Sequence, residues 1–272
     1  MPEPFGVFVR TFTESWQMAD NQHSDLCLFL ERFGGLDASS CEFTDVPDLI
    51  IRYNGTVVGI EHTRLYREDP AIPAGRQLRP QEKIHWRLVE RANELFQQRS
   101  DRRLWLSVIF KEPFNYRQDE IDRDATLLVQ SVLTALSRSQ GADTGESVVR
   151  MQSWKAQQLG LPFPAGVDAY DFTVVHKPGL ELWAPVYGGP VPTLTALQLE
   201  AVIRGKESRL RRYRSRCATA WLLVVTDAGL PSSHFDITEA LEQHVFASGF
   251  DRIFLLTPFL RRLSELRSYR VQ

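Results

Sequence analysis

The sequence lacks the patterns of several common protein classes. Its three cysteines are odd in number and far apart, which argues against a disulfide framework and a cysteine-based zinc site. The longest apolar runs are too short and too interrupted to span a bilayer, and the N-terminus lacks the features of a signal peptide. No Walker, GxGxxG, GxSxG or HExxH motif is present. We therefore expect a soluble, cytoplasmic protein without these familiar active sites.

The chain does contain enough apolar material for a large core. Of its 272 residues, 43% are hydrophobic and 11% are aromatic. The net charge of -2 gives no overall attraction to nucleic acid, but the basic residues are unevenly spread. Arginines and Lys206 gather at 204–216 against a single acidic residue, and a smaller group of arginines lies at 261–270. This pattern predicts a local basic surface, for which a plain solvated helix face is the alternative.

Periodicity and turn residues predict helices that alternate with strands. A helix is expected at about 13–33, where two glycines stop it. The Asn-Gly pair at 54–55 indicates a hairpin, because a type I′ turn needs positive φ at both central residues, so strands are expected at 48–53 and 56–63. Further expected elements are a helix from Pro80, a strand at 104–110, a helix at 119–138, a strand near 170–176, a long helix at 194–214, a strand at 218–226, a short helix near Asp236 and a strand at 252–257.

This order predicts an α/β fold with one mixed central β-sheet and helices on both faces. The hairpin supplies an antiparallel pair, and the continuous apolar strands after it are typical of strands buried on both faces. No internal repeat, low-complexity segment or convincing linker divides the chain. We therefore expect a single domain over 1–272, with an irregular insertion at about 140–195.

The hairpin brings two carboxylates together. With a two-residue turn at 54–55, Ile50 pairs with Gly59 and Asp48 faces Glu61. Directly opposed side chains have Cβ atoms roughly 4.5–5.5 Å apart, where two carboxylates repel unless a cation or a shared proton lies between them. A hard divalent metal suits such a pair, and Gly59 leaves room for a metal-bound phosphate. The alternative is that Asp48 caps a strand and that Glu61 is solvated.

The segment Pro47-Asp48, the hairpin, and then Glu61-His62-Thr63 resemble the motif of the PD-(D/E)XK, or restriction-endonuclease-like, nuclease superfamily. The resemblance implies that Asp48, Glu61 and the backbone carbonyl of His62 hold Mg²⁺ or Mn²⁺. It also implies a lysine that helps to activate water, but Thr63 stands at that position and carries no charge. The superfamily tolerates a lysine that comes from another element of the fold.

Lys206 is the lysine best placed to fill this role. In a helix over 194–214 it shares a stripe with residues such as Leu199 and Tyr213, so it should face the core. A core-facing lysine needs a charged partner, and the two carboxylates offer one. The alternative is a lysine that snorkels to the surface. The run around Lys206, the apolar strand after it and residues 250–255 also resemble uncharacterised members of the same superfamily.

Other charged residues complete the expected site. Glu31, near the end of the first helix, resembles an additional acidic residue that many such nucleases place beside the metal; an exposed helix-end glutamate is the alternative. The His62 side chain should point away from Glu61, because side chains alternate along a strand. Contacts to a nucleic-acid backbone are expected from four arginines of the basic segment: Arg204, Arg209, Arg211 and Arg212.

The resemblance implies a metal-dependent hydrolase of nucleic-acid phosphodiester bonds, with DNA as the expected substrate and no membrane partner. The first alternative is an inactive protein of the same fold that binds nucleic acid or another protein, which the substitution at Thr63 favours. The second alternative is an unrelated α/β enzyme or interaction protein in which the hairpin carboxylates are structural. The sequence leaves the oligomeric state open, with a homodimer as one option.

Overall fold

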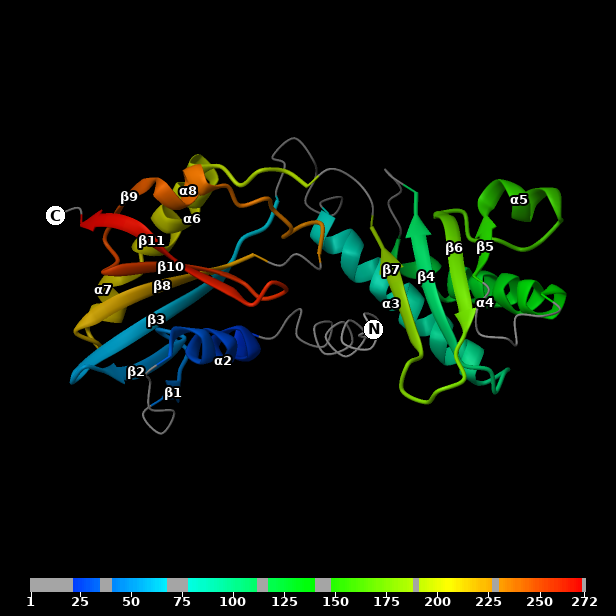
Figure 1. Ribbon diagram of the computed structural model, residues 1–272, viewed down its shortest axis with the longest axis horizontal. Helices are drawn as coiled ribbons and strands as arrows, with labels where there is room; N and C mark the ends of the chain where they lie inside the picture. The colour runs from blue at the N-terminus through cyan, green and yellow to red at the C-terminus, as the bar shows by residue number, and fades with distance from the viewer. Residues whose placement is uncertain are drawn as a thin grey trace, which may run out of the picture. The chain divides into compact units, whose positions relative to one another are not determined.

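The computed structural model describes residues 22–34, 41–67, 78–111, 117–139, 148–187, 191–226 and 230–270. The chain divides into two compact units. Unit 1 combines residues 1–67 with 190–272, and unit 2 is the intervening segment 68–189. In Figure 1, unit 1 holds the blue elements from the start of the chain and the yellow-to-red elements from its end, whereas unit 2 is mainly green. Segments far apart in the sequence thus build unit 1 together.

Unit 1 is built on a seven-stranded mixed sheet. In sheet order its strands are β1 (Glu42–Phe43), β2 (Leu49–Tyr53), β3 (Thr56–Arg64), β8 (Thr219–Val225), β10 (Arg252–Thr257), β11 (Arg262–Arg270) and β9 (Val245–Ser248). The hairpin strands β2 and β3 are antiparallel, whereas β8 runs parallel to both β3 and β10. β3 therefore lies inside the sheet, with a partner strand on each side.

Helices cover both faces of this sheet (Figure 1). They are α2 (Gln22–Phe33), α6 (Ala196–Glu207), α7 (Leu210–Arg214) and α8 (Glu239–Gln243). Phe29 of α2 shares one core with Trp221 of β8, whereas Leu199 of α6 shares a second core with Leu222. Neighbouring residues of β8 thus enter different cores, because successive side chains of a strand point to opposite faces. The predicted cover of helices on both faces is confirmed for this sheet.

The hairpin has the predicted turn and register. Asn54 and Gly55 have φ of 48° and 77°, the positive values that a type I′ turn requires. β2 pairs with β3 in the register that follows from this turn. Continued by one residue, the register places Asp48, directly before β2, opposite Glu61.

The long helix predicted at 194–214 is two helices. α6 ends and α7 begins on either side of a turn formed by Ser208 and Arg209. The Ser208 hydroxyl donates to the Gly205 carbonyl oxygen at 3.0 Å, a local bond of the kind that competes with helical hydrogen bonds. The prediction of one continuous helix is wrong, and the break leaves Lys206 in the last turn of α6.

Unit 2 contains a separate four-stranded mixed sheet. In sheet order its strands are β5 (Val149–Gln152), β6 (Val167–Val174), β4 (Leu104–Phe110) and β7 (Leu182–Val186). Its helices are α3 (Leu78–Gln97), α4 (Ile121–Arg138) after a 3-10 turn at Gln118–Glu120, and α5 (Ser153–Gln158). Val89 of α3 and Leu128 of α4 share a core with Leu106 of β4. The alternating burial of β4 shows that one face of this strand is packed more tightly than the other.

The prediction of one central sheet is wrong, because the strand at 104–110 belongs to the sheet of unit 2. The residues of an apolar strand do not reveal which other strand it pairs with. From the sequence alone, two separate sheets therefore cannot be told from one larger sheet. The insertion expected at about 140–195 overlaps unit 2, which begins earlier, at residue 68. Within the described ranges, the chain is an α/β protein with two mixed β-sheets and seven α-helices.

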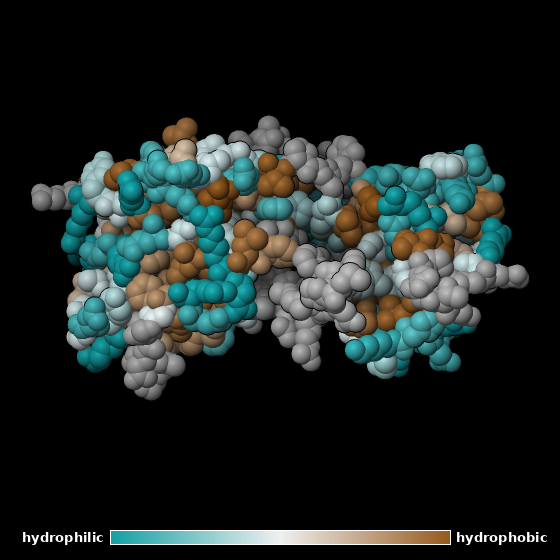
Figure 2. Space-filling model, in the orientation of Figure 1, coloured by the Kyte–Doolittle hydropathy of each residue, from teal (hydrophilic) through white to brown (hydrophobic). Residues whose placement is uncertain are grey.

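Apolar side chains on the surface lie in small groups. The face of unit 1 in Figure 2 is mostly hydrophilic, with separate brown groups among the teal side chains. Leu197, Phe259 and Leu260 are examples of exposed apolar residues, which are normal on the surface of a folded protein. Within the part of the chain that the structure describes, no helix is both long enough and apolar enough to cross a membrane.

Candidate metal and phosphate site

The two hairpin carboxylates belong to the face of the sheet that α6 and α7 cover. Val58 and Ile60 of β3 enter the core beneath α2, so the next residue, Glu61, points to the other side of the sheet. Glu61 is only 3% exposed, and Asp48 is half-buried. The alternative of a solvated Glu61 is therefore wrong. A carboxylate buried to this degree needs charged or hydrogen-bonding partners.

The space above Gly59 is filled by neighbouring side chains. A Cβ atom at Gly59 would lie 2.6 Å from Cys217 Sγ and 2.6 Å from Pro47 Cγ. Glycine is needed here because these two side chains close over the strand. The expectation that Gly59 leaves room for a phosphate is therefore wrong. Any substrate must approach the carboxylates from another direction.

Lys206 reaches the carboxylate pair from the last turn of α6. Its Nζ donates to Glu61 Oε1 at 2.8 Å and to the His62 carbonyl oxygen at 3.3 Å. Leu199 and Ile203, on the same stripe of α6, are buried in the adjoining core. The predicted proximity is confirmed across 145 residues of sequence, and the alternative of a lysine directed away into solvent is wrong.

Three further groups surround the Glu61 carboxyl. Arg209 Nη1 lies 3.7 Å from Glu61 Oε1, and Asp48 and the Tyr213 hydroxyl are near enough to act on its charge. Burial raises the pKa of Glu61 and the charge of Asp48 adds to this, whereas the hydrogen bond and charge of Lys206 and the hydrogen bond of Tyr213 lower it. The net direction is upward. An additional cation at Glu61 would therefore stabilise its charged form.

Two oxygens of the carboxylate pair lie outside the contacts with the His62 backbone N–H, Lys206 and Arg209. The His62 backbone N–H donates to Asp48 Oδ2 at 2.6 Å, and Lys206 and Arg209 both approach Oε1 of Glu61. Asp48 Oδ1 and Glu61 Oε2 remain, and together with the His62 carbonyl they form a set of hard oxygen donors that suits Mg²⁺.

This donor set would be incomplete without other ligands. Among the described residues, no group of three or more His, Cys, Asp and Glu side chains could hold a metal ion. Mg²⁺ commonly keeps several waters and binds through one or two carboxylates together with substrate phosphate. Asp48, Glu61 and the His62 carbonyl therefore fit a site that is completed by water and substrate, and they do not form an all-protein cage.

The His62 side chain points to the opposite face of the sheet, as predicted. Its Nε2 lies 2.8 Å from Asp25 Oδ2, and Arg64 donates to the same carboxylate at 2.8 and 3.0 Å. Burial alone would raise the pKa of Asp25, but the hydrogen bonds and charges of His62 and Arg64 outweigh it and lower this pKa below its ordinary value. This cluster ties α2 to β3. It also holds the ring of His62, and the backbone of His62 contacts Asp48 and Lys206.

Glu31 does not join the carboxylate pair. It lies on the exposed side of α2, about 200° round the helix from the buried Phe29, and forms an ion pair with Arg261 at 2.7 Å. The acidic residue of α2 that turns toward β3 is instead Asp25. Its spacing of four residues from Phe29 is the signal that could have identified it. The expectation of Glu31 beside the metal is corrected, and the exposed helix-end glutamate is what the structure has.

The four arginines expected at a nucleic-acid backbone have different surroundings. Arg204 lies 3.5 Å from the Glu200 carboxylate, and Arg209 lies 3.7 Å from that of Glu61. Arg211 and Arg212 are exposed, and neither has an ion pair with a residue in the described ranges. The last two are therefore the arginines that an anionic ligand could meet without displacing a carboxylate.

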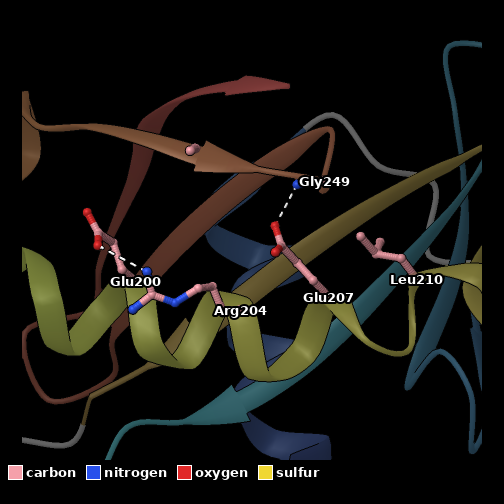
Figure 3. Close-up of a pocket in the computed structure, with 6 residues that line it drawn as sticks. Glu200, Arg204, Glu207, Leu210 and Gly249 are labelled. Carbon is pink, nitrogen blue, oxygen red and sulfur yellow. Dashed lines mark hydrogen bonds and ion pairs between the residues drawn. The ribbon is translucent and has the colours of Figure 1, made fainter. Parts of the chain in front are cut away.

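A pocket of about 440 Å³ opens beside α6. It is lined by Glu200, Arg204, Glu207, Leu210, Ala247 and Gly249. Figure 3 shows Glu200 turned toward Arg204 and the Glu207 carboxylate turned toward the Gly249 backbone N–H, which donates to it at 2.6 Å. The polar groups of this pocket therefore bind one another. Neither the carboxylate pair nor Lys206 lines it, so the pocket is separate from the candidate site.

Comparison of the chain with models of protein families, with curated proteins and with solved structures finds no match. Function is therefore argued from the residues of unit 1 and their geometry. The central observation is that Asp48, Glu61 and Lys206 meet as the sequence predicted.

Proposed function

We propose that unit 1 is a metal-dependent nuclease that hydrolyses phosphodiester bonds of nucleic acid, with DNA as its substrate. The observation that carries this proposal is Lys206, whose Nζ lies 2.8 Å from Glu61 beside Asp48. The PD-(D/E)XK motif combines two carboxylates, a backbone carbonyl and a lysine. In this chain the lysine would come from α6, because Thr63 stands at the usual lysine position. A restriction-endonuclease-like fold of unit 1 is part of the same proposal.

Each group of the site has a distinct role in this reaction. Asp48, Glu61 and the His62 carbonyl would hold Mg²⁺ or Mn²⁺. Such an ion, when bound, supplies Lewis acidity toward the scissile phosphate and lowers the pKa of a coordinated water. Lys206 stabilises the negative charge that develops on the phosphate oxygens or orients the attacking water. Its side chain is 22% exposed, so its ammonium group can turn from Glu61 toward a substrate at the surface.

The charge balance of the site favours an anionic substrate once a metal is held. The carboxylates of Asp48 and Glu61 are matched by the cations of Lys206 and Arg209, so the cluster by itself is close to neutral. A divalent ion would leave an excess of about two positive charges, which phosphate oxygens neutralise. Basic residues position a nucleic-acid backbone without reading its sequence. The exposed arginines of α7 are suited to that purpose.

Cleavage assays test this proposal. Supercoiled plasmid, linear duplex and single-stranded DNA are incubated with the protein in Mg²⁺, Mn²⁺ or EDTA, and product is measured over time. We expect the wild-type protein to cut DNA with metal and not in EDTA. Asp48→Ala and Glu61→Ala should abolish cleavage without loss of fold, while the exposed Glu31→Ala variant is the matched control. Full metal-dependent activity in the Asp48 and Glu61 variants would refute the assignment.

The second candidate function is binding of nucleic acid without hydrolysis. It is favoured by the two ion pairs of Glu61 with Lys206 and Arg209, which already neutralise the carboxylates without a metal. This candidate predicts that the protein shifts DNA on a gel equally well in EDTA and in Mg²⁺, with no cleavage product. A metal-dependent product would exclude it.

A further inference from the structure

The helical turns after α6 continue past both ends of α7. Arg209 and Ser215, which flank α7, both have helical backbone angles. The backbone N–H of Tyr213 donates to the Arg209 carbonyl oxygen at 3.3 Å, and that of Cys217 donates to the Tyr213 carbonyl oxygen at 3.1 Å. The segment 209–216 therefore follows one helical path, so the direction of each side chain follows from its position in the segment.

One face of this helical segment is buried. Tyr213 and Cys217, one turn apart, are 1% and 6% exposed and belong to one core of unit 1. Leu210 packs against the same core. Because successive residues of a helix turn by about 100°, three arginines lie together along one edge of this buried face. These three residues, which we call the arginine row, are Arg209, Arg212 and Arg216.

The arginine row borders the carboxylate pair. At one end, Arg209 Nη1 lies 3.7 Å from Glu61 Oε1, and the Arg209 side chain is 57% exposed. At the other end, Arg216 Nη1 donates to the carbonyl oxygen of Val46 at 2.7 Å. Val46 precedes Asp48 by two residues. The arginine row therefore starts at one carboxylate and ends at the chain segment that leads into the other.

The other arginines of the segment point elsewhere. Arg214 lies on the opposite edge of the buried face, where its Nη2 donates to the Gly249 carbonyl oxygen at 2.6 Å. Arg211 lies about 160° round the helix from the buried Tyr213 and faces away from the core. Arg211 and Arg212 are both exposed, and neither has an ion pair with a residue that the structure describes. These adjacent residues thus differ mainly in direction, and Arg212 is the one that belongs to the row.

We infer that the arginine row binds successive phosphates of one nucleic-acid strand and leads this strand past the carboxylate pair. The inference rests on the proposed function, because it takes Asp48 and Glu61 as the place where the strand is cut. Seven residue steps at about 1.5 Å each make the row about 10 Å long, which suits about two or three phosphates of one strand. A guanidinium group binds phosphate oxygens through two parallel hydrogen bonds.

A nucleic-acid strand fits the arginine row better than a single small anion does. The three charges are spread along the helix, and they continue directly from the carboxylates, as a backbone that is cut there must do. The net charge of the chain is -2, so a local row of cations has to supply the attraction. Arg209 would meet the phosphate nearest to Glu61, and Arg212 the next one along the strand.

DNA binding in EDTA, where no cleavage occurs, tests the inference with two adjacent arginines. A labelled DNA duplex is titrated with each protein at several salt concentrations, and fluorescence anisotropy gives Kd. Arg212→Ala should weaken binding about 5- to 10-fold and lower the slope of log Kd against log salt by about 1, as loss of one phosphate contact does. Arg211→Ala, the matched control, should change Kd by less than about 2-fold. Equal effects of the two substitutions would overturn the inference.

The same titration tests the two ends of the row. Arg209→Ala and Arg216→Ala should each weaken binding to about the same extent as Arg212→Ala. Arg204→Ala should bind DNA like the wild-type protein, because Arg204 lies on α6 and is paired with Glu200. Thermal unfolding verifies that each variant is folded at the temperature of the titration. Binding that depends on Arg204 as strongly as on the ends of the row would overturn the inference.

Cleavage by the same variants in Mg²⁺ separates this inference from the nuclease proposal. Arg212→Ala should raise KM about 5- to 10-fold and leave kcat within about 2-fold, because Arg212 holds a phosphate away from the bond that is cut. A normal KM in this variant would overturn the inference and leave the nuclease proposal intact. A selective loss of binding in Arg212→Ala, in a protein that cuts no DNA, would support the arginine row and refute hydrolysis. Failure of the wild-type protein to bind DNA would overturn both.

Discussion

The two faces of β3 carry polar clusters of opposite character. Beneath α2, Asp25 accepts hydrogen bonds on both oxygens from His62 and Arg64, and its pKa lies below the ordinary value. On the other face, Glu61 is held through one oxygen by Lys206, and its pKa is raised. A buried cluster with every group paired favours one arrangement of the chain, whereas one with unpaired groups retains affinity for a ligand. The first cluster is structural, and the second has the properties of a functional site.

His62 connects these clusters. Its ring bonds Asp25 on one face, while its backbone N–H and carbonyl contact Asp48 and Lys206 on the other. The structural cluster therefore fixes the strand segment that presents the carboxylate pair. Comparison of the two clusters predicts that variants of the first act mainly on stability and variants of the second mainly on catalysis.

The largest effect is expected from Lys206→Met. Removal of the charge should lower kcat for DNA cleavage by about 100- to 10,000-fold, the range typical of a lost proton-transfer or charge-stabilising group. The change also removes one of the two cations beside the buried Glu61, so Tm should fall as well, and the rates are compared at a temperature where both proteins are folded. Initial rates at saturating Mg²⁺ give the measurement. A kcat like that of the wild-type protein would remove Lys206 from the mechanism and leave the cluster a structural one.

Asp25→Ala should have the largest effect on stability. The substitution leaves Arg64 and His62 buried without their carboxylate, and loss of one partner of a buried ion pair costs about 3–5 kcal/mol. Urea denaturation of the variant and the wild-type protein, followed by circular dichroism, measures the difference. A loss below about 1 kcal/mol, the level of an exposed ion pair, would contradict the structural role of this cluster.

The two clusters should respond to pH with opposite signs. Ionised Asp25 stabilises the folded state above its ordinary pKa of 3.8, and this contribution is lost as pH falls through its lowered folded-state pKa. Glu61 stabilises the folded state when protonated; its contribution is complete below 4.5 and is lost as pH rises through its raised folded-state pKa.

Thermal unfolding in EDTA between about pH 3 and about pH 7 measures these signs. Relative to the wild-type protein, Asp25→Asn should lose the most Tm at neutral pH and the least in acid. Glu61→Gln keeps the shape of the side chain. Its Tm relative to that of the wild-type protein should be highest at neutral pH. Parallel Tm profiles for the two variants would contradict the assigned difference between the clusters.

The smallest effect is expected from Glu31→Ala. Glu31 lies on the same helix as Asp25, but its ion pair with Arg261 is exposed, and such pairs contribute about 0–1 kcal/mol. Stability and cleavage should both stay close to those of the wild-type protein, as measured in the same assays. A marked loss of cleavage would contradict the position of Glu31 outside the candidate site.

Local features of the sequence predicted the hairpin and much of the site. The Asn-Gly turn determines the register of β2 and β3, and the register places Asp48 opposite Glu61. Helical periodicity predicted that Lys206 faces inward, which the bond to Glu61 confirms. Both inferences depend on residues that are neighbours along the chain, where geometry is nearly independent of the rest of the fold.

Features that depend on distant partners were beyond such reasoning. Helical spacing could place Asp25 on the inner face of α2, but not its contacts with His62 and Arg64, and nothing in the sequence indicated that Cys217 and Pro47 fill the space above Gly59. It did not separate the two sheets either, because strand pairing depends on which apolar faces meet. The break between α6 and α7 was missed for a similar reason, since helical periodicity continues across it.

The sequence by itself determined that two carboxylates face each other across a tight hairpin, because a two-residue turn permits one register. It also placed a lysine on the inner face of a helix, because the helical repeat is constant. Only the tertiary structure decided that this helix lies against this hairpin and that Lys206 meets Glu61. This contact joins residues that are 145 positions apart in the sequence, and it exists only because α6 packs against the sheet that contains β3.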